Sequence, residues 1–283
     1  MKIFNPILAA ALSVIFFGLA LGQQAALKRT IAKTDKFDFG SGGTILIGGY
    51  PSGSIAVEGT QKDEIELEAE ITIEAATESD LDRLSRVVGF SLDETSGRVE
   101  IVSLGPQNRR YLQKIDPKFP KALVASYVRI DYKLKVPRYS DLQIDGGKGT
   151  LSVKGVDGNI RINYLDADGT IELTGGSLNA LFGSGQVTIS IPTRSWRGRL
   201  ADVQIARGNL DIYLPAGLNA DLDATVLKSG SIENNFPGLV PRVRKAEFSP
   251  QAISAKSGTG GIPLKFMVGE GRLRICTYGA RKK

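Results

Sequence analysis

Between residues 149 and 173 the chain reads Gly149-Thr-Leu-Ser-Val-Lys-Gly155, then Gly158-Asn-Ile-Arg-Ile162, then Gly169-Thr-Ile-Glu-Leu173. In each unit apolar side chains alternate with polar ones, so the apolar ones share one face of a β-strand. Similar pieces, separated by glycine or Asp/Asn turns, recur about every 10 residues from 142 to 236. One such strand leaves its apolar face exposed, whereas stacked coils cover one another. The pattern therefore predicts an all-β chain with a β-solenoid of about two short strands per coil.

Several of these units match the repeat of a bacterial family. The residues that carry the resemblance are Tyr132-Lys-Leu-Lys-Val-Pro137, Leu142-Gln-Ile144, the three units quoted above and the closing Gly271-Arg-Leu-Arg-Ile275. A Val-Pro step followed by repeated Gly-x-apolar-x-apolar units resembles the putative adhesin group, a β-strand-repeat family of the DUF4097 type, over residues 45–278. The resemblance implies a β-helical protein that is secreted or held in the cell envelope. It implies no catalytic residues, because the family supplies none.

Composition narrows the possible functions. Histidine is absent from the 283 residues, and Cys276 is the only cysteine. The chain therefore lacks the usual general base of hydrolytic triads and a common zinc ligand, and we expect neither a catalytic site, nor a metal site, nor a cofactor. Cys276 has no partner for an internal disulfide and is interpreted as an inert thiol near the end of the core. The formal net charge of +6 favours an anionic partner.

The first 22 residues have the parts of a secretory signal peptide. Lys2 supplies a positive charge, residues 7–21 are apolar, and Ala20-Leu-Gly22 is a small-residue cleavage site. The sequence thus predicts export to the periplasm, the cell surface or the medium; retention of this segment as an anchor is the alternative. In that setting the partner is expected to be an anionic envelope polysaccharide, lipid head groups in peripheral contact with a membrane, or another envelope protein, and not nucleic acid. Residues 23–140 form an N-terminal β region and residues 141–283 the solenoid, within one continuous domain.

Two segments of the N-terminal region carry alternating charges. Glutamates alternate with apolar residues over 64–74, and basic residues alternate with apolar ones over 126–136. Each row lies on one exposed face of a strand, and opposite charges on neighbouring strands attract. We therefore expect the two strands to lie close together in an antiparallel β region.

Other elements are predicted from local patterns. Thr77-Glu-Ser-Asp80 resembles a capping box, which predicts one short helix over 79–88. A hairpin is expected over 90–104 with its turn at Glu94-Thr-Ser-Gly97. Residues 23–35 are interpreted as a loose leader before a first strand at 37–49. Residues 237–261, rich in Pro, Gly and Ser, are interpreted as a long excursion before the last strands.

Two basic clusters are candidate sites. The first, which we call the Trp loop, interrupts the repeat with Pro192-Thr-Arg-Ser-Trp-Arg-Gly-Arg199 and places Trp196 among Arg194, Arg197 and Arg199. Arginine offers paired donors to carboxylate or phosphate, and indole offers a flat face for a sugar. The alternative is that Trp196 covers the core and the arginines are solvated. The second, competing cluster is a proline-containing loop over 105–122 that carries Arg109, Arg110, Tyr111 and Lys114.

Three functions remain compatible with the sequence. One is an exported, non-enzymatic β-solenoid with an adhesin-like or scaffolding role. Another is a periplasmic sensor or regulatory binding module. The remaining one is a polysaccharide-active β-helix enzyme, which needs acidic side chains that converge on one site. Asp157, Asp166 and Asp168 are the candidates, but aspartate is also expected in turns for its own hydrogen bonds. We favour the non-enzymatic function.

Overall fold

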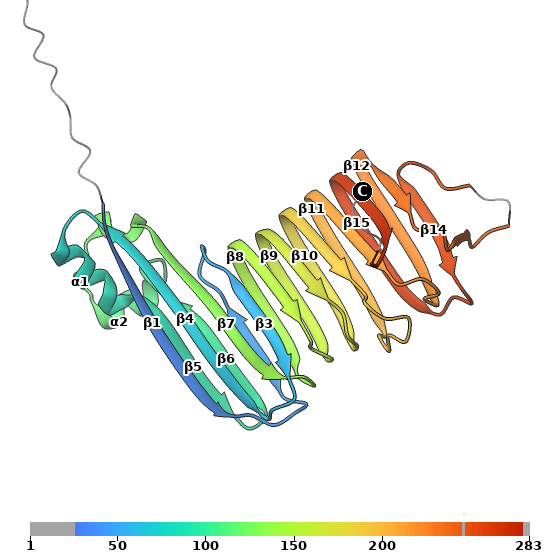
Figure 1. The fold of residues 1–283 in the computed structure, drawn as a ribbon. Coiled ribbons are helices and arrows are strands. Elements are labelled where there is room, and N and C mark those ends of the chain that lie inside the picture. Colours follow the sequence, from blue (N-terminus) through green and yellow to red (C-terminus); the bar gives the residue numbers. More distant parts are fainter. Residues whose placement is uncertain (1–25, 245–246, 280–283) are drawn as a thin grey trace, which may run out of the picture.

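The structure, a computed structural model, describes residues 26–244 and 247–279 and consists mostly of β-strands in one large mixed sheet (Figure 1). The predicted signal peptide lies outside these residues. No helix within them has the length and apolar character needed to cross a membrane. The strands are β1 (Leu27–Asp38), β2 (Thr44–Gly48), β3 (Ile55–Thr60), β4 (Glu64–Ala75), β5 (Gly89–Thr95), β6 (Arg98–Leu104), β7 (Val128–Pro137), β8 (Asp141–Lys154), β9 (Asn159–Glu172), β10 (Ser177–Ser190), β11 (Leu200–Leu214), β12 (Ala220–Asn235), β13 (Leu239–Pro241), β14 (Ala252–Ser257) and β15 (Ile262–Thr277).

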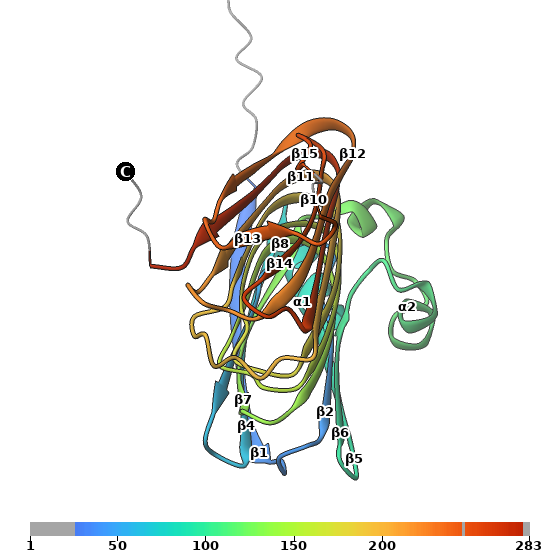
Figure 2. The same ribbon diagram turned by 90° about the vertical axis from the view of Figure 1, so that its right-hand side faces the viewer.

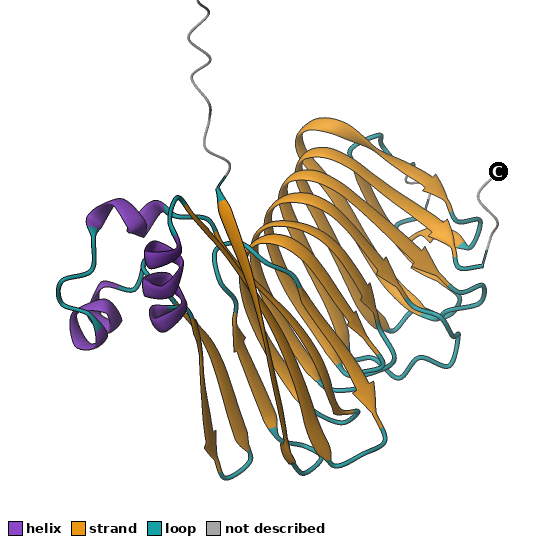
Figure 3. Cartoon of the chain, turned by 60° about the vertical axis from the view of Figure 1, so that its left-hand side comes forward, coloured by secondary structure: helices purple, strands orange, loops and turns teal. Residues whose placement is uncertain are grey.

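The helices are α1 (Glu78–Val87), α2 (Arg109–Ile115) and the 3-10 helix η1 (Lys121–Ala125), and all three lie at the N-terminal end of the sheet (Figure 3). The helix predicted at 79–88 is α1. The side chain of Thr77 accepts a hydrogen bond from the backbone N–H of Asp80 at 3.1 Å, as the capping box requires.

Six long strands run parallel in the order β8-β9-β10-β11-β15-β12. Each bends at its middle, so both halves carry alternating buried side chains (Figure 1). Equivalent positions in β8, β9 and β10 lie 18 residues apart along the chain. Aligned glycines occupy the bend, namely Gly185, Gly208, Gly271 and Gly230 in successive strands. These bends explain why the sequence shows short pieces about half as long as one strand.

The sheet divides into two branches at β8. The first half of β8 pairs with β2, which leads to β6 and β5. The second half pairs with β3, which leads to β7, β4 and β1. The two halves of the bent strands thus continue into two layers, which the end-on view in Figure 2 shows on either side of the interior. The predicted boundary at residue 140 falls between β7 and β8, which belong to the same sheet.

The core is a set of apolar columns that run across the strands. One column contains Ile144, Ile162, Ala180, Val203, Phe266 and Ala224, each opposite the next in the ladder. All six are buried. The apolar positions that predicted inward-facing strands between residues 142 and 236 are buried as expected, apart from Leu200 and Ile232, which are partly exposed. Burial of one such aliphatic side chain contributes roughly 1.5–3 kcal/mol.

The paired charge rows also lie as predicted. Strands β4 and β7 are antiparallel neighbours, with Glu66 opposite Lys135 and Glu68 opposite Lys133. The carboxylate–ammonium distances are 2.7 Å and 3.3 Å. The hydrogen bond from Lys135 lowers the pKa of Glu66 to about 2, against the opposing effect of desolvation. The row is incomplete, since Glu70 faces Asp131.

Three expectations are corrected. The segment interpreted as a loose leader is ordered from Leu27 onward as β1, because the β4 ladder pairs with it over 12 residues. The loop predicted over 105–122 contains α2 and the start of η1, because its prolines flank α2 and do not interrupt it. The excursion over 237–261 contains β13 and β14, which add antiparallel strands to the first half of β12.

Candidate functional site

The Trp loop connects β10 to β11, and its tryptophan is buried. Trp196 is 5% exposed, and its ring lies against Gly198, where a Cβ atom would come within 1.8 Å of the ring. Its indole Nε1 has no hydrogen-bond partner among the described residues. The ring therefore presents no open face on which a sugar could stack.

The three arginines of the Trp loop are exposed. Arg199 donates to Asn159 Oδ1 at 2.7 Å, and Asn159 in turn donates to the Asp141 carboxylate at 3.0 Å. Arg199 is therefore part of a hydrogen-bonded row at the starts of neighbouring strands. Arg194 and Arg197 remain as guanidinium groups that an anionic ligand could reach.

The second basic cluster is carried by a helical segment at the N-terminal end of the sheet. Helix α2 begins after Asn108, whose side chain accepts from the N–H of Tyr111 at 3.1 Å. Leu112 is buried and attaches the helix to the body. Arg109, Arg110 and Lys114 are exposed, whereas Tyr111 is partly buried and packs against the core. Figure 2 shows that α2 projects from the side of the sheet.

The segment 105–127 has a strong positive charge. It contains Arg109, Arg110, Lys114, Lys118 and Lys121 but a single acid, Asp116. That acid is engaged by Arg83 of α1 at 2.8 Å, and this contact lowers the pKa of Asp116. None of the five cations forms an ion pair within residues 26–244 and 247–279, so all five are available to an anionic partner. We call these five residues the cationic segment.

The three aspartates considered for catalysis do not form one site with the Trp loop. Asp157 lies in the turn between β8 and β9. Asp166 accepts from Ser184 Oγ at 2.9 Å near the bend of β9. The Trp loop reaches the start of β9 at Asn159, and a strand segment of seven residues spans about 23 Å. In the described part of the chain no group of three His, Cys, Asp or Glu side chains is arranged to hold a metal ion.

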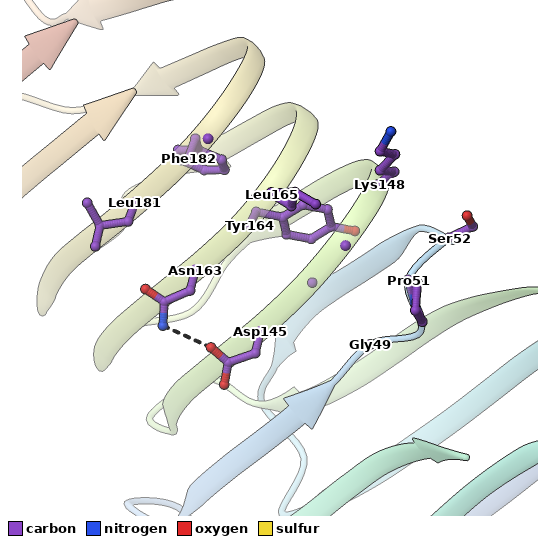
Figure 4. Close-up of a pocket in the computed structure, with 13 residues that line it drawn as sticks. Gly49, Pro51, Ser52, Asp145, Lys148, Asn163, Tyr164, Leu165, Leu181 and Phe182 are labelled. Carbon is purple, nitrogen blue, oxygen red and sulfur yellow. Dashed lines mark hydrogen bonds between the residues drawn. The ribbon is translucent and has the colours of Figure 1, made fainter. Parts of the chain in front are cut away.

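An open groove that sequence reasoning missed lies near the bends of β8 to β10 (Figure 4). Its volume is about 950 Å³, and glycines at 146, 147 and 183 form part of its lining. Leu165 and Leu181 flank it and are more than half exposed. Tyr164 OH donates to the carbonyl of Gly53 at 3.1 Å, and burial raises the pKa of this phenol to about 12. The glycines could have indicated this hollow only if the strand register had been known.

Comparison with known proteins finds structural similarity at low sequence identity. No family model matches the chain, and no curated protein matches it. A crystal structure of a putative cell adhesion protein from Clostridium sporogenes is 13% identical, with a TM-score of 0.48, and the alignment covers 88% of this chain and 100% of that one. A putative adhesin from Bacteroides fragilis is 10% identical, with a TM-score of 0.29 and coverages of 87% and 97%. A putative adhesin from Parabacteroides merdae is 11% identical, with a TM-score of 0.27 and coverages of 86% and 95%.

Proposed function

We propose that the chain is an exported, non-enzymatic β-solenoid of the cell envelope with an adhesin-like or scaffolding role. The observation that carries the proposal is a row of small polar side chains on the outward face of β8 to β10. Ser152, Thr170 and Thr188 lie in register on these three strands, and the row ends at β11, where Asp211 is buried and bound by Arg274. Neighbouring strands are about 4.8 Å apart, so this face presents a regular array of hydrogen-bonding groups, as a binding or assembly surface requires.

The geometry of the parallel strands supports the solenoid assignment. Consecutive coils repeat after 18 residues in β8 to β10, and each strand contributes two bent halves. Each coil covers its neighbour through the shared apolar columns. Export to the periplasm, the cell surface or the medium rests on the predicted signal peptide at residues 1–22. Its test is the molecular mass and the compartment of the protein in fractionated cells.

We further infer that the partner is anionic and that it contacts the cationic segment. The Trp loop is the weaker candidate, because its ring is buried and Arg199 already has a partner. An anionic polysaccharide or a lipid head group presents carboxylate or phosphate oxygens, which arginine binds through paired donors. Attraction between exposed charges decreases as salt concentration rises.

The test compares binding to acidic polysaccharides and to vesicles that contain anionic lipid, at low and high salt. The Arg109→Ala/Arg110→Ala variant should bind several-fold more weakly than the wild type. Two variants with the same loss of charge serve as matched controls: Arg194→Ala/Arg197→Ala for the Trp loop and Lys256→Ala/Lys265→Ala for the rest of the surface. An equal loss in all three variants would indicate general charge attraction, and binding unaffected by the Arg109/Arg110 substitutions would refute the assignment.

The enzymatic alternative has its own test. The purified protein should leave envelope and plant polysaccharides intact over long incubation. Turnover that disappears in an Asp168→Asn variant would overturn the non-enzymatic proposal and place an acid catalyst at the bend of β9.

A further inference from the structure

Strand β1 is a long edge strand whose outer side has no neighbour. It pairs with β4 along one side over its 12 residues, and no described strand pairs with its other side. All its side chains are exposed or only partly buried. Figures 1 and 3 show β1 along the outside of the N-terminal layer. Such an edge presents unpaired backbone N–H and C=O groups that can bind another strand.

We propose that β1 is a self-association surface, on which β1 of a second copy pairs in antiparallel orientation about a two-fold axis at Thr34. In this arrangement Lys33 of each copy faces Asp35 of the other copy. Ile31 of each copy likewise faces Phe37 of the other, so the two-fold axis repeats both pairs. Both apolar residues already pack against the core from its margin, so the pairing would extend the core between the two copies. A two-fold contact of this kind is the commonest route to a homodimer.

Charge complementarity selects this register. A symmetric antiparallel pairing that uses at least nine residues of β1 must be centred on Ile31, Ala32, Lys33 or Thr34, given the bounds 27–38. The first three centres place like charges opposite each other: Arg29 with Lys33, Lys28 with Lys36, and Lys33 with itself. Like charges directly opposite each other are destabilising. The register centred on Thr34 places no like charges opposite each other.

The side chains that this pairing needs are free to form it. Lys33 and Asp35 make no ion pair within the described part of the chain, and the Lys33 ammonium lies 5.8 Å from the centre of the Phe90 ring. Arg29, which binds Glu78 and Asp82 of α1, lies outside the nine paired residues at 30–38. The contacts of Arg29 with α1 therefore remain intact in the dimer. The inference is independent of the function proposed above.

Cross-linking at the axis tests the register. In a Cys276→Ser background, Thr34→Cys places two thiols opposite each other, where Cβ atoms in an antiparallel pair are about 5 Å apart, close to disulfide reach. Mild oxidation should then give a covalent dimer in high yield. Ala32→Cys is the matched control on the same face, because residue 32 faces Lys36 and its two copies lie about 13 Å apart. Equal yields from both variants would overturn the register.

Charge reversal tests the attraction by an independent measurement. Sedimentation equilibrium of the wild type should show a dimer that forms reversibly with concentration. Lys33→Asp and Asp35→Lys each replace two attractive pairs by two repulsive ones and should weaken association by about tenfold or more. The double variant Lys33→Asp/Asp35→Lys restores opposite charges and should restore the dimer. A wild-type chain that stays monomeric at every concentration, or a double variant no better than the single ones, would refute the proposal.

Discussion

Gly208, at the bend of β11, occupies a position where a larger residue is excluded by the neighbouring strand β10. Its φ is +139°, and a Cβ atom would lie 1.9 Å from the carbonyl oxygen of Gly185. We expect Gly208→Ala to lower the free energy of unfolding by at least about 1–3 kcal/mol, from backbone strain and from the forced separation of the two strands. Urea denaturation measures the loss. Gly40→Ala is the control, since nothing lies within 4 Å of the added methyl group; a similar loss there would contradict this explanation.

Ile171 and its neighbour Thr170 test the inward and outward faces of β9. Ile171 is fully buried, whereas Thr170 is exposed. Ile171→Asp places an unpaired carboxylate in the core and should destabilise the protein by more than about 4 kcal/mol. Thr170→Asp should change stability by only about 0.5 kcal/mol. Thermal melting of both variants tests which side chain faces the core. A wild-type melting temperature for Ile171→Asp would show that the assignment of faces is wrong.

At the scale of elements, the pairing of β4 with β7 makes a prediction about pH. Contact with Lys135 lowers the pKa of Glu66 from 4.5 to about 2. Ionised Glu66 therefore stabilises the folded state above its ordinary pKa, and this contribution is lost as the pH falls from about 4.5 to about 2. In Lys135→Met the pKa of Glu66, measured by NMR titration of its carboxyl carbon, should rise toward 4.5. Lys133→Met, beside Glu68, is the control, and an unchanged Glu66 pKa in Lys135→Met would exclude Lys135 as the cause.

The elements that sequence predicts well are those encoded by neighbouring residues. The cap at Thr77 and the turn at Gly97 specify α1 and the β5–β6 hairpin from a few adjacent positions. The sequence does not predict strand β1, because its polar sequence becomes a strand only through the partner β4, whose paired residues lie 26 to 48 positions further along the chain. The sequence does not predict helix α2, because three prolines in the segment 105–122 indicate an irregular loop. These prolines lie outside the bounds of α2 and leave its hydrogen bonds intact.

The candidate site was predictable to a smaller degree. The cationic segment is visible as sequence, and the structure leaves its charges exposed. The stacking role expected for Trp196 requires an exposed face of the indole ring. The ring is covered, because the loop folds back and places it against Gly198. The groove beside Leu165 depends on the register of three strands. Burial and register arise from contacts between distant residues, which periodicity alone does not encode.

At the scale of the whole molecule, the stack ends in a cap. Strands β14 and β13 cover the first half of β12, and the N–H of Ile232 in its second half donates to the carbonyl of Pro250 at 2.7 Å. Without a cap, the open edge of β12 could pair with strands of other chains. We expect Ile253→Asp, at a buried position of β14, to give concentration-dependent aggregation detectable by light scattering. The exposed neighbour Ala252→Asp is the control, and a soluble Ile253→Asp variant would show that the cap is dispensable.

The position of β15 affects when the protein can fold. This last strand lies between β11 and β12 and is hydrogen-bonded to both, with Leu210 and Ile232 on either side of Leu273. During synthesis β12 is therefore complete while the position of β15, between β11 and β12, is still vacant. Strand β12 acquires its parallel neighbour only when residues 262–277 have emerged. Contacts between segments so far apart in the sequence form slowly. A nascent chain that stops before residue 262 leaves β11 and β12 with unpaired edges, so the C-terminal part of the fold is completed only once residues 262–277 have been made.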